Sequence, residues 1–204
     1  DISTGRPEGS NMGYGISGGR DFIWVCLPYL NAAGEDIALT WWGDAKNRTA
    51  KPTLDYCLKA VPWICEQYGG DPEQIILCGF SRGAIACNYL GLHDDRVAGL
   101  WRAFIPYSHY DGIAAWPYPG SDRDSAGARL KRLAKRPQFI CHEFTVSRLN
   151  LAATRRWLES TGLTENITFA ETGFRNHNDA WLLRPSATRR QIRRWLKGVL
   201  VQKR

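Results

Sequence analysis

The sequence predicts an α/β fold, in which a mostly parallel central sheet carries helices on both of its faces. Short, continuous apolar runs, which are typical of strands buried on both faces, recur along the chain. Longer stretches with helical periodicity separate them, and this alternation is characteristic of parallel α/β sheets. Because neither an internal repeat nor a linker interrupts the pattern, we expect residues 1–204 to form a single domain.

The expected elements follow from apolar runs, helix caps and turn residues. The first 20 residues are rich in glycine and are expected to form a loop. Strands are expected at about residues 22–27, 74–79, 102–107, 138–142 and 166–170. Helices are expected at about residues 53–68, 82–92, 125–135 and 151–160, and from about residue 186 onward. Thr53 is a good N-cap for the first of these helices, and Pro62 should kink it.

Composition and charge exclude several classes of function. The apolar fraction of 44% and the charged fraction of 23% are ordinary for a globular domain. No apolar run reaches the length of about 18 residues that a transmembrane helix needs, so no membrane insertion is expected. The net charge is +7, but the basic residues near the C-terminus share one side of an amphipathic helix. No nucleic-acid motif accompanies them, so a solvated helix face is favoured over a nucleic-acid partner.

The cysteines indicate neither a metal site nor a redox site. No C-x-x-C pair occurs, so we expect no metal and no cofactor. The six thiols lie mostly in apolar runs and are expected to be buried: Cys26, Cys57, Cys65, Cys78, Cys87 and Cys141. The disulfide and oligomeric states stay open. Since the first residue is Asp1, we expect a processed or trimmed form of a longer chain, and secretion or a periplasmic location would fit a removed signal peptide.

The segment Gly79-Phe80-Ser81-Arg82-Gly83 fits the pattern G-x-S-x-G. The pentapeptide alone is common by chance, but here a buried strand enters it and a helix leaves it. The resulting sharp turn would lift the Ser81 hydroxyl above the carboxyl edge of the sheet, and both glycines would let strand and helix approach closely. The backbone N–H of Arg82, at the start of the helix, could stabilise an oxyanion. This context favours a catalytic nucleophile over a serine with only a structural role in the turn between strand and helix.

A serine nucleophile needs a base, and the sequence offers four histidines. His177 follows the last strand in a polar loop before the final helix, so a base at the carboxyl edge is expected there. His93 follows the nucleophile helix on the opposite edge and is expected to be structural. His109 and His142 lie at strand ends, where they could line the site.

With these residues in place, the chain resembles the α/β-hydrolase superfamily, in particular its small bacterial esterases and polyester-depolymerase-like members. The resemblance covers about residue 22 onward and rests on the Ser81 pentapeptide, on His177 before the last helix and on the strand–helix order. It implies the α/β-hydrolase fold, a triad in the chain order serine, acid, histidine, and acyl transfer through an acyl-enzyme. The strands that usually open this fold are missing from the sequence, and we favour a longer parent over a minimal version.

The triad acid is where the sequence departs from the family pattern. Family members usually carry an Asp after the strand that precedes the penultimate helix, and here Glu143 is the only carboxylate close by. The rival is Asp111, which follows the preceding strand, where some lipases of the superfamily have their acid. Without a catalytic role, Glu143 would form a surface ion pair and Asp111 would be a turn residue. We favour Glu143, with Asp111 as the alternative.

The remaining site residues are expected on loops at the same edge. The glycine-rich N-terminal stretch should supply the second oxyanion donor, with Gly5 as the candidate, although the family's His-Gly signature is absent. Candidates for substrate binding are aromatic: Trp41, Trp42, Tyr110 and Trp116. Such side chains suit a sugar, an aryl acid or a polyester chain, but packing over the sheet explains them equally well.

The sequence therefore predicts a serine esterase that acts on small-molecule or polymeric carboxylic esters. Plant polysaccharide esters, aryl esters and polyesters are the candidate substrates. Arg82 directly after the serine resembles enzymes that hydrolyse glucuronate esters, where an arginine could assist the oxyanion or an acidic substrate. One alternative is a peptidase of the same fold, which usually carries an additional gating domain. The other is a catalytically inactive binding protein that has kept the fold.

Overall fold

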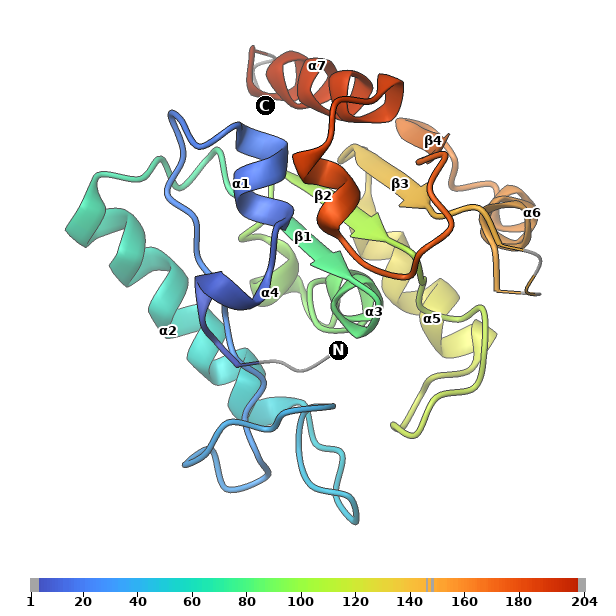
Figure 1. Ribbon diagram of the computed structural model, residues 1–204. Helices are drawn as coiled ribbons and strands as arrows, with labels where there is room; N and C mark the ends of the chain where they lie inside the picture. The colour runs from blue at the N-terminus through green and yellow to red at the C-terminus, as the bar shows by residue number, and fades with distance from the viewer. Residues whose placement is uncertain (1–3, 146, 148, 202–204) are drawn as a thin grey trace.

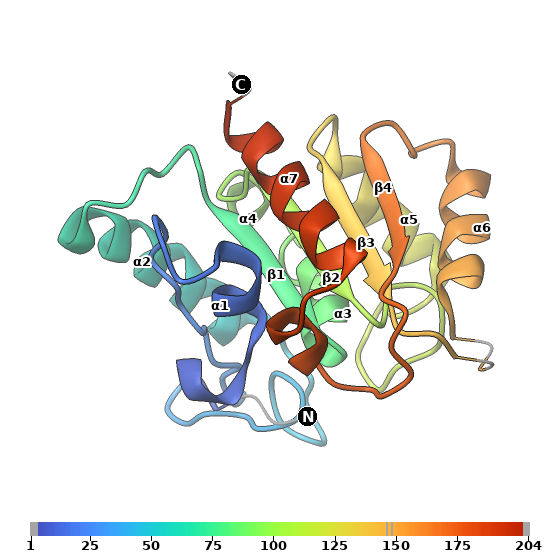
Figure 2. The ribbon, with the colours of Figure 1, turned by 45° about the horizontal axis from the view of Figure 1, so that its top comes forward.

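A computed structural model describes residues 4–145, 147 and 149–201. Its centre is a parallel sheet in the order β1-β2-β3-β4. The strands are β1 (Ile76–Phe80), β2 (Ala103–Tyr107), β3 (Gln138–His142) and β4 (Ile167–Glu171). Figures 1 and 2 show the strands side by side, with helices in front of the sheet and behind it. This arrangement confirms the predicted α/β architecture.

Two apolar clusters cover the two faces of the sheet. One joins the sheet to the larger set of helices: α2 (Lys51–Tyr68), α3 (Arg82–Tyr89), α4 (Asp95–Ala98), α5 (Arg123–Leu130) and α6 (Leu151–Thr161). The other joins it to α1 (Met12–Ser17), η3 (Ala180–Leu183) and α7 (Ala187–Val201). The short 3-10 turns η1 (Pro7–Gly9) and η2 (Lys131–Leu133) complete the elements. Because both faces are covered, β2 and β3 are buried along their whole length, including the polar ends of β3, Gln138 and His142.

The strand expected at residues 22–27 is absent. The run forms no regular element, and Phe22, Ile23 and Val25 each expose 40% or more of their surface. A strand needs a hydrogen-bonded neighbour as well as apolar residues, and none of the described strands lies beside this run. The strand β1, which leads to Ser81, is consequently an edge strand of the described sheet.

Other element ends differ from the expectations by a few residues. The helix after the nucleophile ends at Tyr89, where residue 92 was expected, and the helix expected at 125–135 is α5 followed by η2. All six cysteines are free thiols. Within the described ranges, no helix is long and apolar enough to cross a membrane.

Candidate active site

Ser81 lies on the turn between β1 and α3, in a conformation that few non-glycine residues adopt. Its φ is 54° and its ψ is −115°, and such strained backbone costs about 1–3 kcal/mol. The turn is held from both sides. The backbone N–H of Ser81 donates to the Tyr107 carbonyl on β2 at 3.0 Å, and its carbonyl accepts from Ala84 N–H at 3.0 Å. The strand and the helix thus fix the strained turn, and with it the hydroxyl of Ser81.

The two glycines of the pentapeptide differ in their surroundings. A Cβ on Gly79 would collide with the backbone carbonyl of Gly83, so a side chain at this position would force β1 and α3 apart. A Cβ on Gly83 would meet no atom within 4 Å. The expectation that both glycines serve a close approach is therefore wrong for Gly83, because its Cβ position faces open space.

His177 lies in the loop between β4 and η3 and connects two of the predicted residues. Its Nε2 is 3.1 Å from Oγ of Ser81, and its Nδ1 is 2.7 Å from Oε1 of Glu143. The Phe80 ring lies against the imidazole, with ring centroids 4.8 Å apart. The structure thus brings Ser81, His177 and Glu143 into one line of hydrogen bonds.

Glu143 follows β3 directly and is 6% exposed. Burial acts to raise the pKa of this carboxyl, but the hydrogen bond with His177 and a backbone hydrogen bond at Glu143 itself, with smaller contributions from His142 and Ser108, lower the pKa to about 2. Glu143 is therefore a buried carboxylate that stays ionised near neutral pH.

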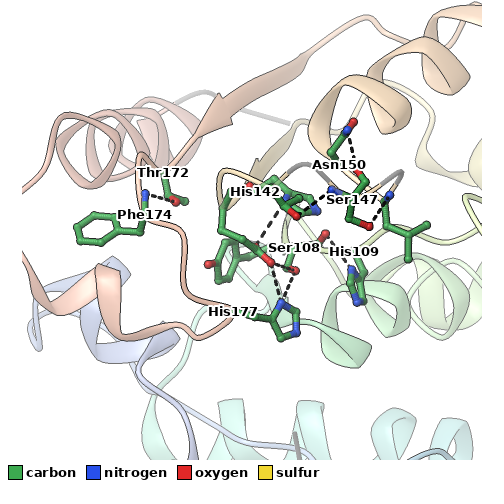
Figure 3. Close-up of polar contacts among 12 residues, drawn as sticks. Ser108, His109, His142, Ser147, Asn150, Thr172, Phe174 and His177 are labelled. Carbon is green, nitrogen blue, oxygen red and sulfur yellow. Dashed lines mark hydrogen bonds and ion pairs between the residues drawn. The ribbon is translucent and has the colours of Figure 1, made fainter.

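Ser108, the residue after β2, contacts the same carboxylate. Its hydroxyl donates to Oε1 of Glu143 at 3.0 Å and lies 3.1 Å from Nδ1 of His177. Figure 3 shows the side chains of Ser108 and His177 directed toward each other. The sequence reasoning missed this residue. A polar residue directly after a fully apolar strand, at the edge that carries the nucleophile, was the available signal.

Asp111 lies elsewhere, in a structural ion pair. Its Oδ2 is 2.8 Å from Nη2 of Arg129, and its Oδ1 accepts from the Tyr118 hydroxyl at 2.9 Å. Burial raises the pKa of Asp111, although the Arg129 charge opposes this. Of the two candidate acids, the structure brings Glu143 to His177 and Asp111 to Arg129.

The loop that carries His177 is tied to other parts of the fold. The Tyr107 hydroxyl donates to the backbone carbonyl of Asn178 at 2.9 Å. The Asp179 carboxylate accepts from the backbone N–H and the side-chain amide of Asn11, at 2.7 and 2.8 Å. These bonds join the loop to β2 and to the N-terminal segment, and the sequence reasoning identified neither anchor.

The other histidines surround this cluster or lie far from it. Nδ1 of His109 donates to the carbonyl of Ser108 at 3.0 Å, and its ring centroid is 5.3 Å from that of His177. Burial lowers the pKa of His109, which favours its neutral form. His142 is buried and donates from Nδ1 to the Glu143 carbonyl at 2.8 Å. His93 packs against Tyr89, a residue of α3.

Three of the aromatic candidates belong to the core: Trp41, at 6% exposed, Trp42 and Tyr110. The last two are the most enclosed. Trp42 is fully buried and stacks on Tyr89, with ring centroids 4.6 Å apart. Tyr110 is 1% exposed, and its hydroxyl donates to Oε1 of Gln138 at 2.8 Å. Both side chains fill space among the helices and leave almost no surface for a ligand.

The buried Trp41 and the half-buried Trp116 lie between Arg82 and His109. The guanidinium carbon of Arg82 is 5.4 Å from the ring centroid of Trp41. Trp41 in turn contacts Trp116, with centroids 5.8 Å apart, and Trp116 lies 5.5 Å from His109. These contacts form an arc from Arg82 to His109 beside Ser81, which we call the aromatic arc.

A cleft of about 1230 Å³ runs along the outer edge of β1. The segment 21–29 forms its other wall, where the described residues place no strand. Gly5, with a φ of 65°, also lines the cleft, as do Arg82 and His177. Gly5 thus shares a cavity with the backbone that follows the serine. Within the described ranges, no group of three or more His, Cys, Asp or Glu side chains could hold a metal ion.

Comparison with known proteins identifies the fold. No family model and no curated protein matches the sequence. An esterase mutant of known structure is 15% identical and covers 79% of this chain and 58% of its own, with a TM-score of 0.51. The protein TT1662 from Thermus thermophilus is 12% identical, covering 75% of this chain and 64% of its own, with a TM-score of 0.50. This chain has the α/β-hydrolase fold.

A thermostable esterase gives a similar match, with 16% identity, 74% of this chain and 37% of its own covered, and a TM-score of 0.49. The chain therefore spans less than two thirds of the length of each of these structures. At such identities the likeness concerns the α/β-hydrolase fold alone. In this fold a serine on the turn between a strand and a helix lies above the carboxyl edge of the sheet. Ser81 occupies this position on the β1–α3 turn.

Proposed function

We propose that this protein is a serine hydrolase that cleaves carboxylic esters through an acyl-enzyme on Ser81. The observation that carries the proposal is the unbroken line of hydrogen bonds from Oγ of Ser81 through His177 to Glu143. Such a line makes a hydroxyl reactive, because the imidazole can accept its proton while the carboxylate orients and stabilises the imidazolium that forms.

The reaction has two steps. Nε2 of His177 takes the proton of Ser81 as Oγ attacks the ester carbonyl, and a tetrahedral oxyanion forms. When the bond to the leaving oxygen breaks, the imidazolium returns that proton to the departing alcohol. A water molecule then attacks the acyl-enzyme with the same histidine as base, and the carboxylic acid and the free serine are released.

Two backbone groups would stabilise the oxyanion in this proposal. Arg82 is the first residue of α3, so its N–H lies at the positive end of the helix dipole and directly follows the nucleophile. Gly5 is the second candidate, since it lines the same cleft as Arg82 and His177. Loss of one such donor typically costs about 10²–10³ in kcat.

The aromatic arc is the proposed binding surface for the substrate. Trp116 is half-buried and would offer its ring to the substrate, while Trp41, at 6% exposed, supports it from the core and packs under Arg82. A tryptophan ring favours a flat or sugar-like group. An aryl ester, a sugar ester or a polyester segment would suit this surface. The proposal leaves out Trp42 and Tyr110, because they expose only 0% and 1% of their surface and are not part of the aromatic arc.

Short p-nitrophenyl esters test the proposal directly. Turnover should fall by about 10³-fold or more in Ser81→Ala and in His177→Ala, because each removes a member of the proton-transfer line. The control is Ser160→Ala, which removes an exposed hydroxyl that bonds only within α6. A fluorophosphonate probe should label the wild type at Ser81. Equal turnover in all four proteins would contradict the proposal, and an unlabelled, inactive wild type would indicate a binding protein.

A further inference from the structure

We propose that Ser108 is a positioning residue, whose hydroxyl holds the Glu143 carboxylate and the His177 imidazole in register for proton transfer from Ser81. This inference rests on the proposed function and assigns a role to a further residue of the same site. The sequence pattern of the site does not include Ser108, because the residue directly follows β2, the strand beside β1.

The geometry closes a triangle of polar atoms. Oε1 of Glu143 is 2.7 Å from Nδ1 of His177 and 3.0 Å from Oγ of Ser108, and Oγ and Nδ1 are 3.1 Å apart. Ser108 is 1% exposed, so bulk water does not compete for its hydroxyl. Because Oγ and Nδ1 share one acceptor, the Ser108 hydroxyl limits the positions that the carboxylate can take relative to the imidazole.

The backbone of Ser108 is equally constrained. Its N–H donates to the Cys141 carbonyl on β3 at 2.9 Å, and its own carbonyl accepts from Nδ1 of His109 at 3.0 Å. Its φ is 85°, a region that favours glycine and strains other residues. Glycine would relieve this strain but would lose the hydroxyl. A buried serine in a conformation suited to glycine indicates that the side chain itself has a role.

The carboxylate also has few other donors. Oε2 of Glu143 is buried and has no hydrogen-bond partner among the described residues, although Nδ1 of His142 lies 3.4 Å away. Tyr107, Cys141 and His109 are further titratable groups that interact with Glu143. Burial raises the pKa values of Tyr107 and Cys141 and lowers that of His109, which favours the neutral form of all three. The hydroxyl of Ser108 and the imidazole of His177 are therefore the two side-chain groups that lie within 3.0 Å of Oε1 of Glu143 among the described contacts.

Two variants separate the hydroxyl from the backbone strain. Ser108→Ala and Ser108→Gly both lack the hydroxyl, but only glycine suits the positive φ. If the hydroxyl positions the base, both variants should lose about 10- to 100-fold in kcat with little change in KM, the effect expected for one lost hydrogen bond to a charged group. The acid limb of the pH–rate profile should move upward in both, because the full carboxylate charge then holds the proton on the imidazole.

Thermal unfolding of the same proteins gives the contrasting readout. Ser108→Gly should unfold at a higher temperature than Ser108→Ala, while the two should have similarly reduced kcat values. If activity follows stability instead, with Ser108→Gly close to the wild type and its pH profile unchanged, the role of Ser108 is structural and the proposal is overturned.

A double-mutant cycle tests the route of the effect. Ser108→Ala should cost at most about threefold in a Glu143→Gln background, because the charge that the hydroxyl steadies is already gone. An equal loss in both backgrounds overturns the inference. Turnover that survives Ser81→Ala contradicts the proposed function, and the inference fails with it. Turnover that requires Ser81 but ignores the hydroxyl of Ser108 contradicts the inference alone.

Discussion

Arg129 holds the carboxylate of Asp111 with two nitrogens, Nε at 2.9 Å and Nη2 at 2.8 Å from the same oxygen, Oδ2. Both side chains are buried, at 10% and 2% exposure. Both oxygens of the Asp111 carboxylate are therefore engaged, Oδ2 by Arg129 and Oδ1 by the Tyr118 hydroxyl, so neither is available to His177. The pair links α5 to the connection that follows β2, so its contribution is to folding.

The contrast between the two carboxylates gives the first prediction. Asp111→Asn should lower the free energy of unfolding by about 3 kcal/mol, because the buried charge of Arg129 loses its partner. The folded fraction should keep its kcat within a few-fold. Glu143→Gln should instead lower kcat by about 10³–10⁴-fold, since an amide cannot stabilise the imidazolium. Urea unfolding and turnover of one ester measure both effects. If kcat falls more in Asp111→Asn than in Glu143→Gln, the catalytic acid is Asp111 and the role of Glu143 is structural.

The low pKa of Glu143 gives a prediction for acid stability. The folded-state pKa is about 2, and an unfolded glutamate has a value of about 4.3. Because the folded value is lower, the unfolded state binds more protons between the two. The stabilisation is complete above the unfolded value and is lost as the pH falls toward 2. From pH ~5 to pH ~3, the free energy of unfolding should fall more in the wild type than in Glu143→Gln, by on the order of 1 kcal/mol.

Urea unfolding of the two proteins at both pH values measures this difference directly. Contributions from other acidic groups largely cancel, because the proteins differ only at residue 143. An equal loss in both would show that Glu143 is not held ionised by its contacts with His177 and Ser108.

The strand–turn–helix arrangement around Ser81 could be predicted from the sequence because it is local. An apolar strand, a tight turn and a helix follow one another within the span of Ile76 to Tyr89. The bond between Ser108 and Glu143 joins residues 35 positions apart, and that between Asn11 and Asp179 spans 168 positions. Such contacts depend on the packing of whole elements, which no local pattern encodes.

Two other errors have physical reasons of the same kind. The apolar run 22–27 has strand composition, but a strand also requires a neighbour, which the described residues do not supply. Trp41 and Trp42 are adjacent in the sequence and both are buried, yet Trp42 stacks on Tyr89 while the Arg82 guanidinium lies over the ring of Trp41. Residue type alone predicts burial in such cases, and the direction of each ring follows only from the packed fold.

The two glycines of the pentapeptide provide a matched pair of variants. Gly79→Ala should lower the free energy of unfolding by about 2–3 kcal/mol, because its Cβ would overlap the backbone of Gly83. Gly83→Ala should leave stability unchanged or raise it by up to about 1 kcal/mol, since its Cβ meets open space and alanine favours the helix. Thermal unfolding of both variants distinguishes them. Equal destabilisation would contradict the difference in their surroundings.

The anchoring of the His177 loop by Asp179 gives the last prediction. Asp179→Ala removes the acceptor for both nitrogens of Asn11 and should lower the free energy of unfolding by about 2 kcal/mol. His177 lies two residues earlier in the loop, so its Nε2 should occupy the position near Ser81 for less of the time. We expect kcat to fall by about tenfold, because small misplacements of a catalytic group are costly.

Limited proteolysis gives an independent readout of the same anchor. The N-terminal segment should loosen in Asp179→Ala, so trypsin should cleave after the exposed Arg20 faster than in the wild type. Asp124→Ala, which removes an exposed carboxylate at the start of α5, is the matched control and should change neither kcat nor cleavage. If cleavage is faster but kcat is unchanged, the contact between Asp179 and Asn11 stabilises the N-terminal segment without positioning His177. Unchanged values of both would show that Tyr107 alone suffices to hold the loop, through its bond to Asn178.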